Sequence, residues 1–390
     1  MSGTVPTITA GSINGITGLT DRPVYFLRLN GSPTPNLVVK GDAASDAHID
    51  MTDEDAAVSI KWGSKLMKNV NNELVNTKIM TPPEVALFKQ AAMMAFSSAS
   101  KQYLNVGPGG PAYCWVKMPH VPGLSDADFF KKYDSGPGAR VVPKDIKANI
   151  LKFADDQVWT DLGKVVAVDI FNGNSDRFTI DDGYWQNKGN VMFLAGGTTS
   201  VIGLDTFNPN GRMQANLNRG GGYPELNTLI DVNRRNEYAL ACVTSVGAEM
   251  KRALLSAKGM GTTSITIKSD GPDGPVVSTI QVASIGTMFV DYAPVFAAGI
   301  AAGAESLKAY LQAKVRQYAP PVQPRNPWAR TAPSAGAVLA HAHVRGVPNN
   351  IQMPPLPGQQ PPPRPNIPPP APVKTIPQGI LDRMAYLHWI

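Results

Sequence analysis

The distribution of proline limits which part of this chain can form a packed domain. Of the 35 prolines in 390 residues, 18 lie between positions 319 and 378, with runs at 361–363 and 368–370. Proline lacks a backbone N–H and has a fixed φ angle, so this segment is expected to be extended or polyproline-like and to contribute nothing to a core. The compact structure is therefore expected from residues 1–318, which are long enough for two lobes with cores of their own.

The last residues, 379–390, differ from the proline-rich segment before them. They form a short apolar stretch with Ile380, Met384, Leu387 and Trp389, and they could make a helix. Side chains of this size are not expected to stay in water. The end of the chain is therefore expected to dock on the folded body or on a partner.

Charge follows the same division of the chain. From position 319 onward there are six Lys or Arg against one acid, so about +5 of the formal net charge of +6 lies in this part. The rest is nearly neutral and has no basic stripe interleaved with aromatic residues, so nucleic-acid binding is not expected.

The two cysteines, Cys114 and Cys242, lie in apolar sequence and are expected to be core thiols without a disulfide. Asp291, Pro294 and several glycines interrupt the apolar stretch 284–304, which favours a buried segment over a membrane span.

The N-terminus has no charged start followed by an apolar core, so no cleavable signal peptide is expected. Its Ser, Thr, Gly and Ile content would suit the mobile leader of a bacterial effector or toxin that is exported into a host cell without cleavage.

Gly11, Gly15 and Gly18 precede the first predicted strand, and backbone N–H groups without neighbouring side chains can approach phosphates. A flexible N-terminal segment over 1–20 explains the same glycines.

Patterns of apolar residues predict an α+β fold, with strands first and helices later. Apolar and β-branched runs at 24–29 and 36–41, joined by a turn, predict two strands, and 112–123 predicts a third that Pro and Gly stop. Apolar residues at every fourth position predict a helix over 53–71. Further helical patterns, expected to build a larger second lobe, lie at 225–255 and 296–318.

The most informative motif is a polar loop followed by a hairpin. Apolar runs at 191–194 and 198–204 flank a Gly-Gly dipeptide, which tolerates the positive φ angles of a tight turn. In an antiparallel hairpin, residues equidistant from the turn face each other, so Asn190 is expected roughly opposite Asp205. Two oxygen ligands at an open strand end suit Mg²⁺, which keeps most of its waters and takes one or two protein oxygens plus substrate phosphates.

Asp176 lies in the loop before this hairpin, in the sequence Asn-Ser-Asp-Arg, and would be free to accept a hydroxyl proton. The same sequence is also good turn chemistry, because Asn and Asp cap their own backbone. In that alternative, Asp176 pairs with Arg177 or with a nearby lysine. Asp176, Asn190 and Asp205 taken together favour a site for a nucleotide, a divalent cation and an acceptor hydroxyl.

A family resemblance rests on these residues. The segment 161–178, D-L-G-K-V-V-A-V-D-I-F-N-G-N-S-D-R-F, is followed by Gly-Asn and an apolar strand ending in Asp205. It resembles the catalytic segment of atypical kinases of the actin-fragmin kinase type, which in turn resembles that of phosphoinositide kinases. The resemblance implies that Asp176 is the catalytic aspartate and that Asp169 is structural. It assigns Mg²⁺ to Asn190 and Asp205.

The resemblance also assigns residues that bind ATP. It places Lys40, in the sequence V-V-K-G at the end of a strand, on the α- and β-phosphates. It makes 112–123 the hinge between two lobes, where the backbone of 117–121 would bind adenine and Met118 would pack on the ring. The hinge residues assigned to the cofactor are Lys117, Met118, His120 and Val121.

One part expected of such a kinase is missing. A kinase pairs its strand lysine with an acid on the following helix, but Ile60 stands where the resemblance places that acid. The remaining candidates are Glu54, Asp55, Glu73 and Glu84. The gap leaves open a partner-dependent kinase, an unusual grip on the phosphates, or a pseudokinase.

The predicted architecture is a two-lobed, protein-kinase-like α+β fold. Its parts are a flexible N-terminus (1–20), a β-rich N-lobe with hinge (21–123), a mostly helical C-lobe (124–318), a proline-rich tail (319–378) and a docking segment (379–390).

The expected activity is Mg-ATP-dependent phosphorylation of a hydroxyl side chain of a protein, with actin a candidate through the resemblance alone. Alternatives are a lipid-type kinase, nucleotidyl transfer on the same scaffold, or a pseudokinase that recruits partners through its tail. P-x-x-P motifs in the tail could bind SH3-type modules, or the tail could be a passive spacer.

Overall fold

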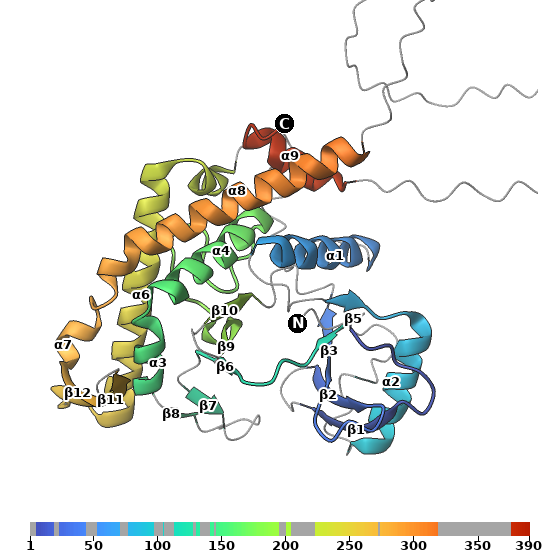
Figure 1. Ribbon diagram of the computed structural model, residues 1–390, viewed down its shortest axis with the longest axis horizontal. Helices are drawn as coiled ribbons and strands as arrows, with labels where there is room; N and C mark the ends of the chain where they lie inside the picture. The colour runs from blue at the N-terminus through green and yellow to red at the C-terminus, as the bar shows by residue number, and fades with distance from the viewer. Residues whose placement is uncertain are drawn as a thin grey trace, which may run out of the picture. The chain divides into compact units, whose positions relative to one another are not determined.

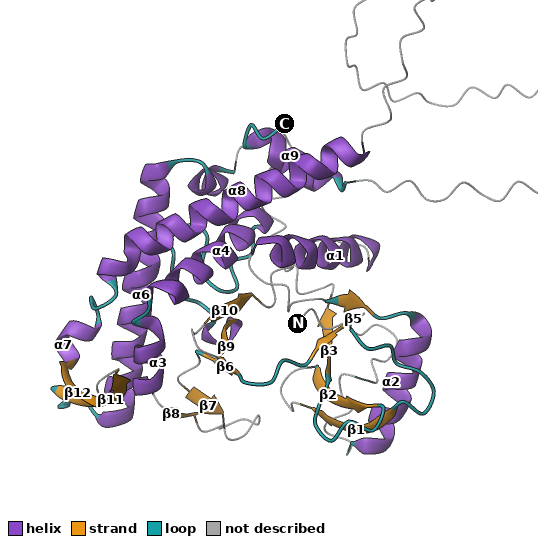
Figure 2. Cartoon of the chain, in the orientation of Figure 1, coloured by secondary structure: helices purple, strands orange, loops and turns teal. Residues whose placement is uncertain are grey.

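The structure, a computed structural model, describes residues 5–18, 23–43, 53–70, 77–96, 104, 113–127, 130–132, 141–143, 146–194, 200–203, 223–271, 274–318 and 376–390. The first part is rich in strands and the second in helices, so the fold is α+β, as the apolar patterns predict (Figure 1, Figure 2). Residues 1–315 together with 376–390 form one compact unit, and 316–375 form another. The lobe boundary predicted between 123 and 124 lies inside the first unit.

A five-stranded antiparallel sheet dominates the first part, with the strand order β1-β2-β3-β5-β4. Its strands are β1 (Ile13–Gly18), β2 (Val24–Leu29), β3 (Leu37–Ala43), β4 (Lys78–Ile79) and β5 (Tyr113–Pro119). The three predicted strands are confirmed as β2, β3 and β5, with small shifts at their ends. Buried residues alternate along β2 and β3, so one face of the sheet carries the core. The core residues of these two strands are Tyr25, Leu27, Leu29, Leu37 and Val39.

The N-terminal segment belongs to this sheet, which corrects the prediction of a flexible segment over 1–20 for the part that the structure describes. β1 pairs with β2, and Val5 and Ile8 are buried in the same core. The segment is ordered because its apolar side chains pack on that core while its backbone pairs with β2. Gly15, one of the glycines expected near phosphates, lies in β1, and the Arg28 side chain fills the space that a Cβ of Gly15 would occupy.

The core face of the sheet is covered by α2 (Pro82–Ala95). Phe88 of this helix is fully buried and packs against Tyr25 and Trp115, with ring centroids 5.1 Å apart in both pairs. Because aromatic rings bury large apolar areas, this cluster is a main source of cohesion for the β-rich part.

The second part is mostly helical, with small antiparallel sheets. Its helices are α3 (Ile146–Phe153), α4 (Asp156–Asn172), α6 (Val232–Lys258), α7 (Val282–Ile285), α8 (Ala293–Tyr318) and α9 (Gln378–Tyr386), with the 3-10 turns η3 (Lys188–Asn190), η4 (Pro224–Leu229) and η5 (Val290–Tyr292). The sheets are β10-β9-β6 (Ser200–Gly203, Val191–Leu194, Leu124–Asp126), β7-β8 (Phe130–Lys132, Val141–Pro143) and β11-β12 (Ser264–Gly271, Gly274–Gln281). The helical patterns at 225–255 and 296–318 are found as η4 with α6 and as α8.

Helix α1 (Asp53–Val70) links the two parts and is the helix predicted over 53–71. It contacts β4 and β5 of the first part and α4 of the second. Met67 of α1 is fully buried, and its side chain would clash with a Cβ placed on Gly203 of β10. The helix therefore packs directly on the hairpin that follows the predicted catalytic loop.

Helices α4 and α8 cross at close contact through glycines (Figure 1). A Cβ on Gly163 would stand 2.5 Å from the carbonyl oxygen of Phe296, and one on Gly299 would clash with the carbonyl oxygen of Thr160. Beside the crossing, Trp159 packs on Phe296 with ring centroids 5.6 Å apart. Glycine at these positions is what allows the two backbones to approach.

The run 282–318, which contains α7 and α8, is the one helical stretch among the described residues that is long and apolar enough to cross a membrane. Its apolar side chains that are fully buried within the protein include four large ones on α8. These are Phe296, Ile300, Leu307 and Leu311. They serve as core residues of the helical part.

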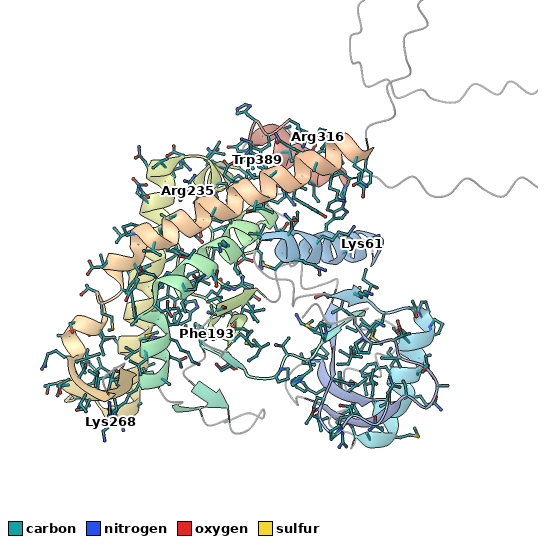
Figure 3. The ribbon with its side chains drawn as sticks, viewed as in Figure 1. Lys61, Phe193, Arg235, Lys268, Arg316 and Trp389 are labelled. Atoms are coloured by element: carbon teal, nitrogen blue, oxygen red, sulfur yellow. The ribbon has the colours of Figure 1, made fainter. Side chains whose placement is uncertain are left out.

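The C-terminal segment packs on the same compact unit. Four of its large apolar side chains are deeply buried: Ile380, Met384, Leu387 and Trp389. The side-chain amide of Gln312 on α8 donates to the carbonyl oxygen of Trp389 at 2.7 Å, and Trp389 is seen beside α8 in Figure 3. The burial is the outcome expected from the apolar composition of this segment.

Candidate functional site

The predicted catalytic loop begins where α4 ends. The helix is capped at its start by Asp155, whose carboxylate accepts the N–H of Gln157 at 2.8 Å. It ends at Gly173, which has a φ of 72°. Glycine adopts this left-handed conformation at no steric cost, so it stops the helix and turns the chain into the loop that carries Asp176.

A buried ion pair between Asp169 and Arg177 holds this loop to α4. Arg177 is fully buried, its guanidinium contacts Asp169, and its Nε donates to the carbonyl oxygen of Asn190 at 2.8 Å. Asn174 donates to the other oxygen of Asp169 at 3.1 Å and accepts the backbone N–H of Asp176 at 3.0 Å. Burial raises the pKa of Asp169 to about 6, although the guanidinium and the hydrogen bonds act to lower it. Asp169 thus has the structural surroundings that its expected role requires.

Asp176 receives amide donors from both sides. Asn190 Nδ2 donates to Asp176 Oδ2 at 2.5 Å, and Asn187 Nδ2 donates to Oδ1 at 3.4 Å. Arg177, the alternative partner for Asp176, makes its ion pair with Asp169. Asp176 is partly exposed. It is therefore a carboxylate held in one orientation, with part of its surface open to solvent.

The predicted hairpin follows directly and is confirmed. β9 and β10 pair antiparallel, with Val191 opposite Gly203. Asp205, the second predicted metal ligand, lies outside the described residues. Asn190 directly precedes β9 and is buried. Because its amide nitrogen donates to Asp176, the atom that Asn190 can offer to a cation is its amide oxygen, a ligand type that Mg²⁺ accepts.

Residues 178–188, between Asp176 and Asn190, are tied to α6. Glu249 of α6 accepts from Lys188 Nζ at 3.0 Å and from the Tyr184 hydroxyl at 3.2 Å. Burial acts to raise the pKa of Glu249, but hydrogen bonds from Arg252 and Lys188 outweigh it, so the pKa lies below its ordinary value. Since Lys188 belongs to η3, this anchor also supports the turn that orients Asp176.

Lys40 lies on β3, in the face of the sheet opposite to the buried core. Its cross-strand neighbours are Val24 on β2 and Val116 on β5, and the next pair along that face is Val38 with Met118. Apart from Val116, these residues are only half-buried. A lysine among half-buried apolar side chains is suited to a ligand with an apolar ring and a negative group. Lys40 and Met118 therefore share one face of the sheet.

Backbone groups of the predicted hinge are partly paired with neighbouring strands of the sheet. Lys117 is paired with both neighbouring strands, β3 and β4. The backbone N–H of His120 donates to the carbonyl oxygen of Asn36 at 3.2 Å, and the His120 ring packs edge-on against a neighbouring phenylalanine. Met118 is paired with Val38 of β3, so it can offer its side chain to a ligand, and of the residues assigned to the hinge Val121 remains as a candidate to offer backbone groups to adenine.

Glu84, a candidate for the acid that pairs with Lys40, forms a buried ion pair with Lys117 instead. The same Glu84 oxygen accepts the N–H of Ile8 at 3.0 Å, and Lys117 Nζ donates to the carbonyl oxygen of Pro6 at 2.9 Å. The pair therefore ties the N-terminal segment, α2 and β5 together. Its role is structural.

Three other acids are predicted as possible partners of Lys40. The side chains of Glu54, Asp55 and Glu73 lie outside the part of the chain whose side chains the structure describes. The acid that pairs with Lys40 therefore stays open.

Several site residues escaped sequence reasoning. Asn174 and Asn187, which orient Asp176, gave no signal stronger than that of ordinary turn residues. Asn187 does cap η3 by accepting the N–H of Gly189 at 3.1 Å, and its position just before a Lys-Gly pair is a weak sign of such a cap. The start of α2 could have been found, because Thr-Pro-Pro-Glu at 81–84 is a capping pattern with proline in the first turn.

A cavity of about 390 Å³ lies elsewhere, between α3 and β11, and contains none of the predicted site residues. Lys147, Leu151, Ile267 and Lys268 are among its lining residues.

Comparison of the chain with protein-family models, with curated proteins and with solved structures found no match in any of the three.

Proposed function

We propose that this protein is a Mg-ATP-dependent phosphotransferase with a kinase-like arrangement of lobes, acting on a hydroxyl side chain of a protein. In this proposal Asp176 positions the acceptor hydroxyl and takes its proton. Asn190 and Asp205 hold Mg²⁺, and Lys40 contacts the α- and β-phosphates while the base packs on the sheet face near Met118. Phosphoryl transfer depends mainly on positioning and charge neutralisation, and this set of residues can supply both.

The observation that carries the proposal is the orientation of Asp176. The ion pair of Asp169 with Arg177 would by itself hold the loop to α4. Two further amides, from Asn187 and Asn190, fix a carboxylate that is still partly exposed. A general base needs this combination of fixed direction and access.

Support also comes from the order of the parts. A lysine on β3 precedes a helix, α1, that packs on the hairpin of the second part, and the oriented aspartate lies between α4 and that hairpin. This is the order that the resemblance to actin-fragmin-type kinases implies. The proposed substrate, a protein hydroxyl, is taken from the resemblance.

The test compares Asp176→Asn with Asp181→Asn in the full chain. Both variants make the same chemical change within one loop segment, and Asp181 is exposed. The replaced side chain at 176 still has an oxygen that can accept from Asn190, so the fold should be kept. With Mg-ATP and a mixed lysate, we expect Asp176→Asn to lose roughly 10²- to 10⁴-fold in the rate of phosphate transfer while binding ATP normally. Asp181→Asn should match the native protein.

The mass of the modification decides between reaction classes. Addition of phosphate to proteins supports the proposal, and phosphate found only on lipids would replace the protein acceptor with a lipid one. Addition of AMP would mean nucleotidyl transfer. No modification at all, with ATP still bound, would mean a pseudokinase. Equal rates in the two variants would remove Asp176 from the chemistry.

A further inference from the structure

The C-terminal segment packs on the end of α4, the helix that leads into the proposed catalytic loop. Trp389 stacks on Phe171 with ring centroids 5.7 Å apart and an interplanar angle of 2°. The guanidinium of Arg383 lies 5.7 Å from the centre of the same ring. Phe171 is fully buried and belongs to the last turn of α4. Two parts of the chain that are far apart in sequence therefore meet at one aromatic ring.

The docking of this segment does not depend on that ring alone. Gln312 of α8 donates to the carbonyl oxygen of Trp389 at 2.7 Å, and Trp389 is seen beside α8 in Figure 3. Ile380, Met384 and Leu387 are buried as well. The segment is thus held against both α8 and the end of α4.

Phe171 is close along the helix to the residues that hold Asp176. Asp169, two positions earlier, pairs with Arg177 and accepts from Asn174. Asn174 in turn accepts the backbone N–H of Asp176 at 3.0 Å. A displacement of the last turn of α4 would therefore be passed to Asp176 through these hydrogen bonds.

We propose that the segment 376–390 is a positioning element of the active site, in which Trp389 and Arg383 hold the last turn of α4 through Phe171. This inference rests on the proposed function. The covalent connection between the segment and α8 runs through the proline-rich stretch 319–375. Its release from Phe171 therefore requires no break in the fold of the body, and it would leave Asp176 less well held.

The test uses point variants of the full chain. Trp389→Ala removes the stacked ring, and Ile390→Ala is the matched control because Ile390 is the next residue and is 57% exposed. Hydrogen exchange of the backbone amides is measured over 378–390 and over 173–177. We expect Trp389→Ala to speed exchange in both regions, and Ile390→Ala to change neither.

Transfer kinetics provide a second readout. Trp389→Ala should lower kcat by roughly tenfold or more with an unchanged KM for ATP, because a misplacement of about 1 Å can cost up to 10²-fold. A merely structural loss would lower the amount of folded protein and leave the kcat of the folded fraction unchanged. If Trp389→Ala does not fold, Arg383→Lys replaces it, since lysine keeps the charge but loses the planar contact with Phe171.

Faster exchange in 378–390 with unchanged exchange in 173–177 would overturn the proposal. So would equal kinetics for Trp389→Ala and Ile390→Ala. Absence of any transfer by the native protein would contradict the proposed function instead. In that case the exchange measurement still decides whether Trp389 and the loop are coupled.

Discussion

Glu84 is a single carboxylate on which three parts of the chain converge. Its oxygens accept the N–H groups of Thr81 at 3.1 Å and Ile8 at 3.0 Å, and it is paired with Lys117. The Glu84 and Lys117 side chains are only 6% and 5% exposed. A buried charge that loses its partner is costly, so this pair fixes the position of the N-terminal segment on the sheet.

Glu84→Gln should lower the free energy of unfolding at pH 7 by about 3–5 kcal/mol, because Lys117 stays buried without a counter-charge. Burial acts to raise the pKa of Glu84, but hydrogen bonds from Lys117, Thr81 and Ile8 outweigh it, so the folded pKa lies below the ordinary 4.5. A lowered pKa means that this stabilisation is complete above pH 4.5 and is lost as the pH falls through the folded value. Urea unfolding of native protein and variant should therefore show a difference that shrinks below pH 4.5.

Glu237→Gln is the control for this measurement, since Glu237 is exposed on α6. It should change the free energy of unfolding by less than about 0.5 kcal/mol at any pH. A Glu84→Gln effect that did not vary with pH would show that lost packing, and not lost charge, is its cause.

At the scale of secondary-structure elements, the crossing of α4 and α8 depends on glycine. Gly299→Ala should destabilise the protein by about 1–3 kcal/mol, because the new methyl group meets the backbone of α4 and the helices must separate. Gly286→Ala is the control: its Cβ would lie 3.6 Å from Lys251 Cδ, an ordinary contact, and its φ of −61° suits alanine. Thermal unfolding of both variants is the measurement. Equal midpoints would mean that the helices can separate without cost.

At the scale of the whole molecule, the proline-rich residues connect two helices of the same compact unit. The chain leaves that unit after residue 315, near the end of α8, and returns to it at Ile376 before α9. The stretch is therefore closed at both ends, where the sequence alone predicts a tail with a docking segment. Closing a longer loop costs little more, since each doubling of length adds about 0.6 kcal/mol.

Deleting 324–372 should leave the melting temperature unchanged or slightly raised, because a proline-rich sequence is not expected to build a packed core and a shorter loop is easier to close. Removing 379–390 should lower it, because Leu387 and Trp389 would each lose about 1.5–3 kcal/mol of burial. Calorimetry of the two truncated chains gives the comparison. Equal stability would mean that the end segment contributes nothing to the body, and strong destabilisation by the first deletion would mean that the proline-rich residues pack on the rest of the protein.

Local sequence patterns were sufficient to predict the helices and strands that position the candidate site. Turn residues and the spacing of apolar side chains predict β2, β3, α1 and the β9-β10 hairpin, because each depends on neighbours within a few positions. The same patterns place Asp176 in a loop before the hairpin and Asn190 at its start. The apolar residues at 379–390 also predict that this end docks, but they leave open whether it docks on the body or on a partner. The N-terminal strand was missed because glycines and polar residues interrupt its pattern.

Only the tertiary structure decided which side chains meet. Glu84 could have paired with Lys40, but the sheet order puts β5 beside β3 and α2 over the core face, which brings Lys117 to it. The pairing of Asp169 with Arg177 and the stacking of Trp389 on Phe171 are decided in the same way. Local propensity is set by neighbours in sequence, whereas an ion pair or a ring contact depends on a distance in space. That distance exists only once the helices and strands have packed.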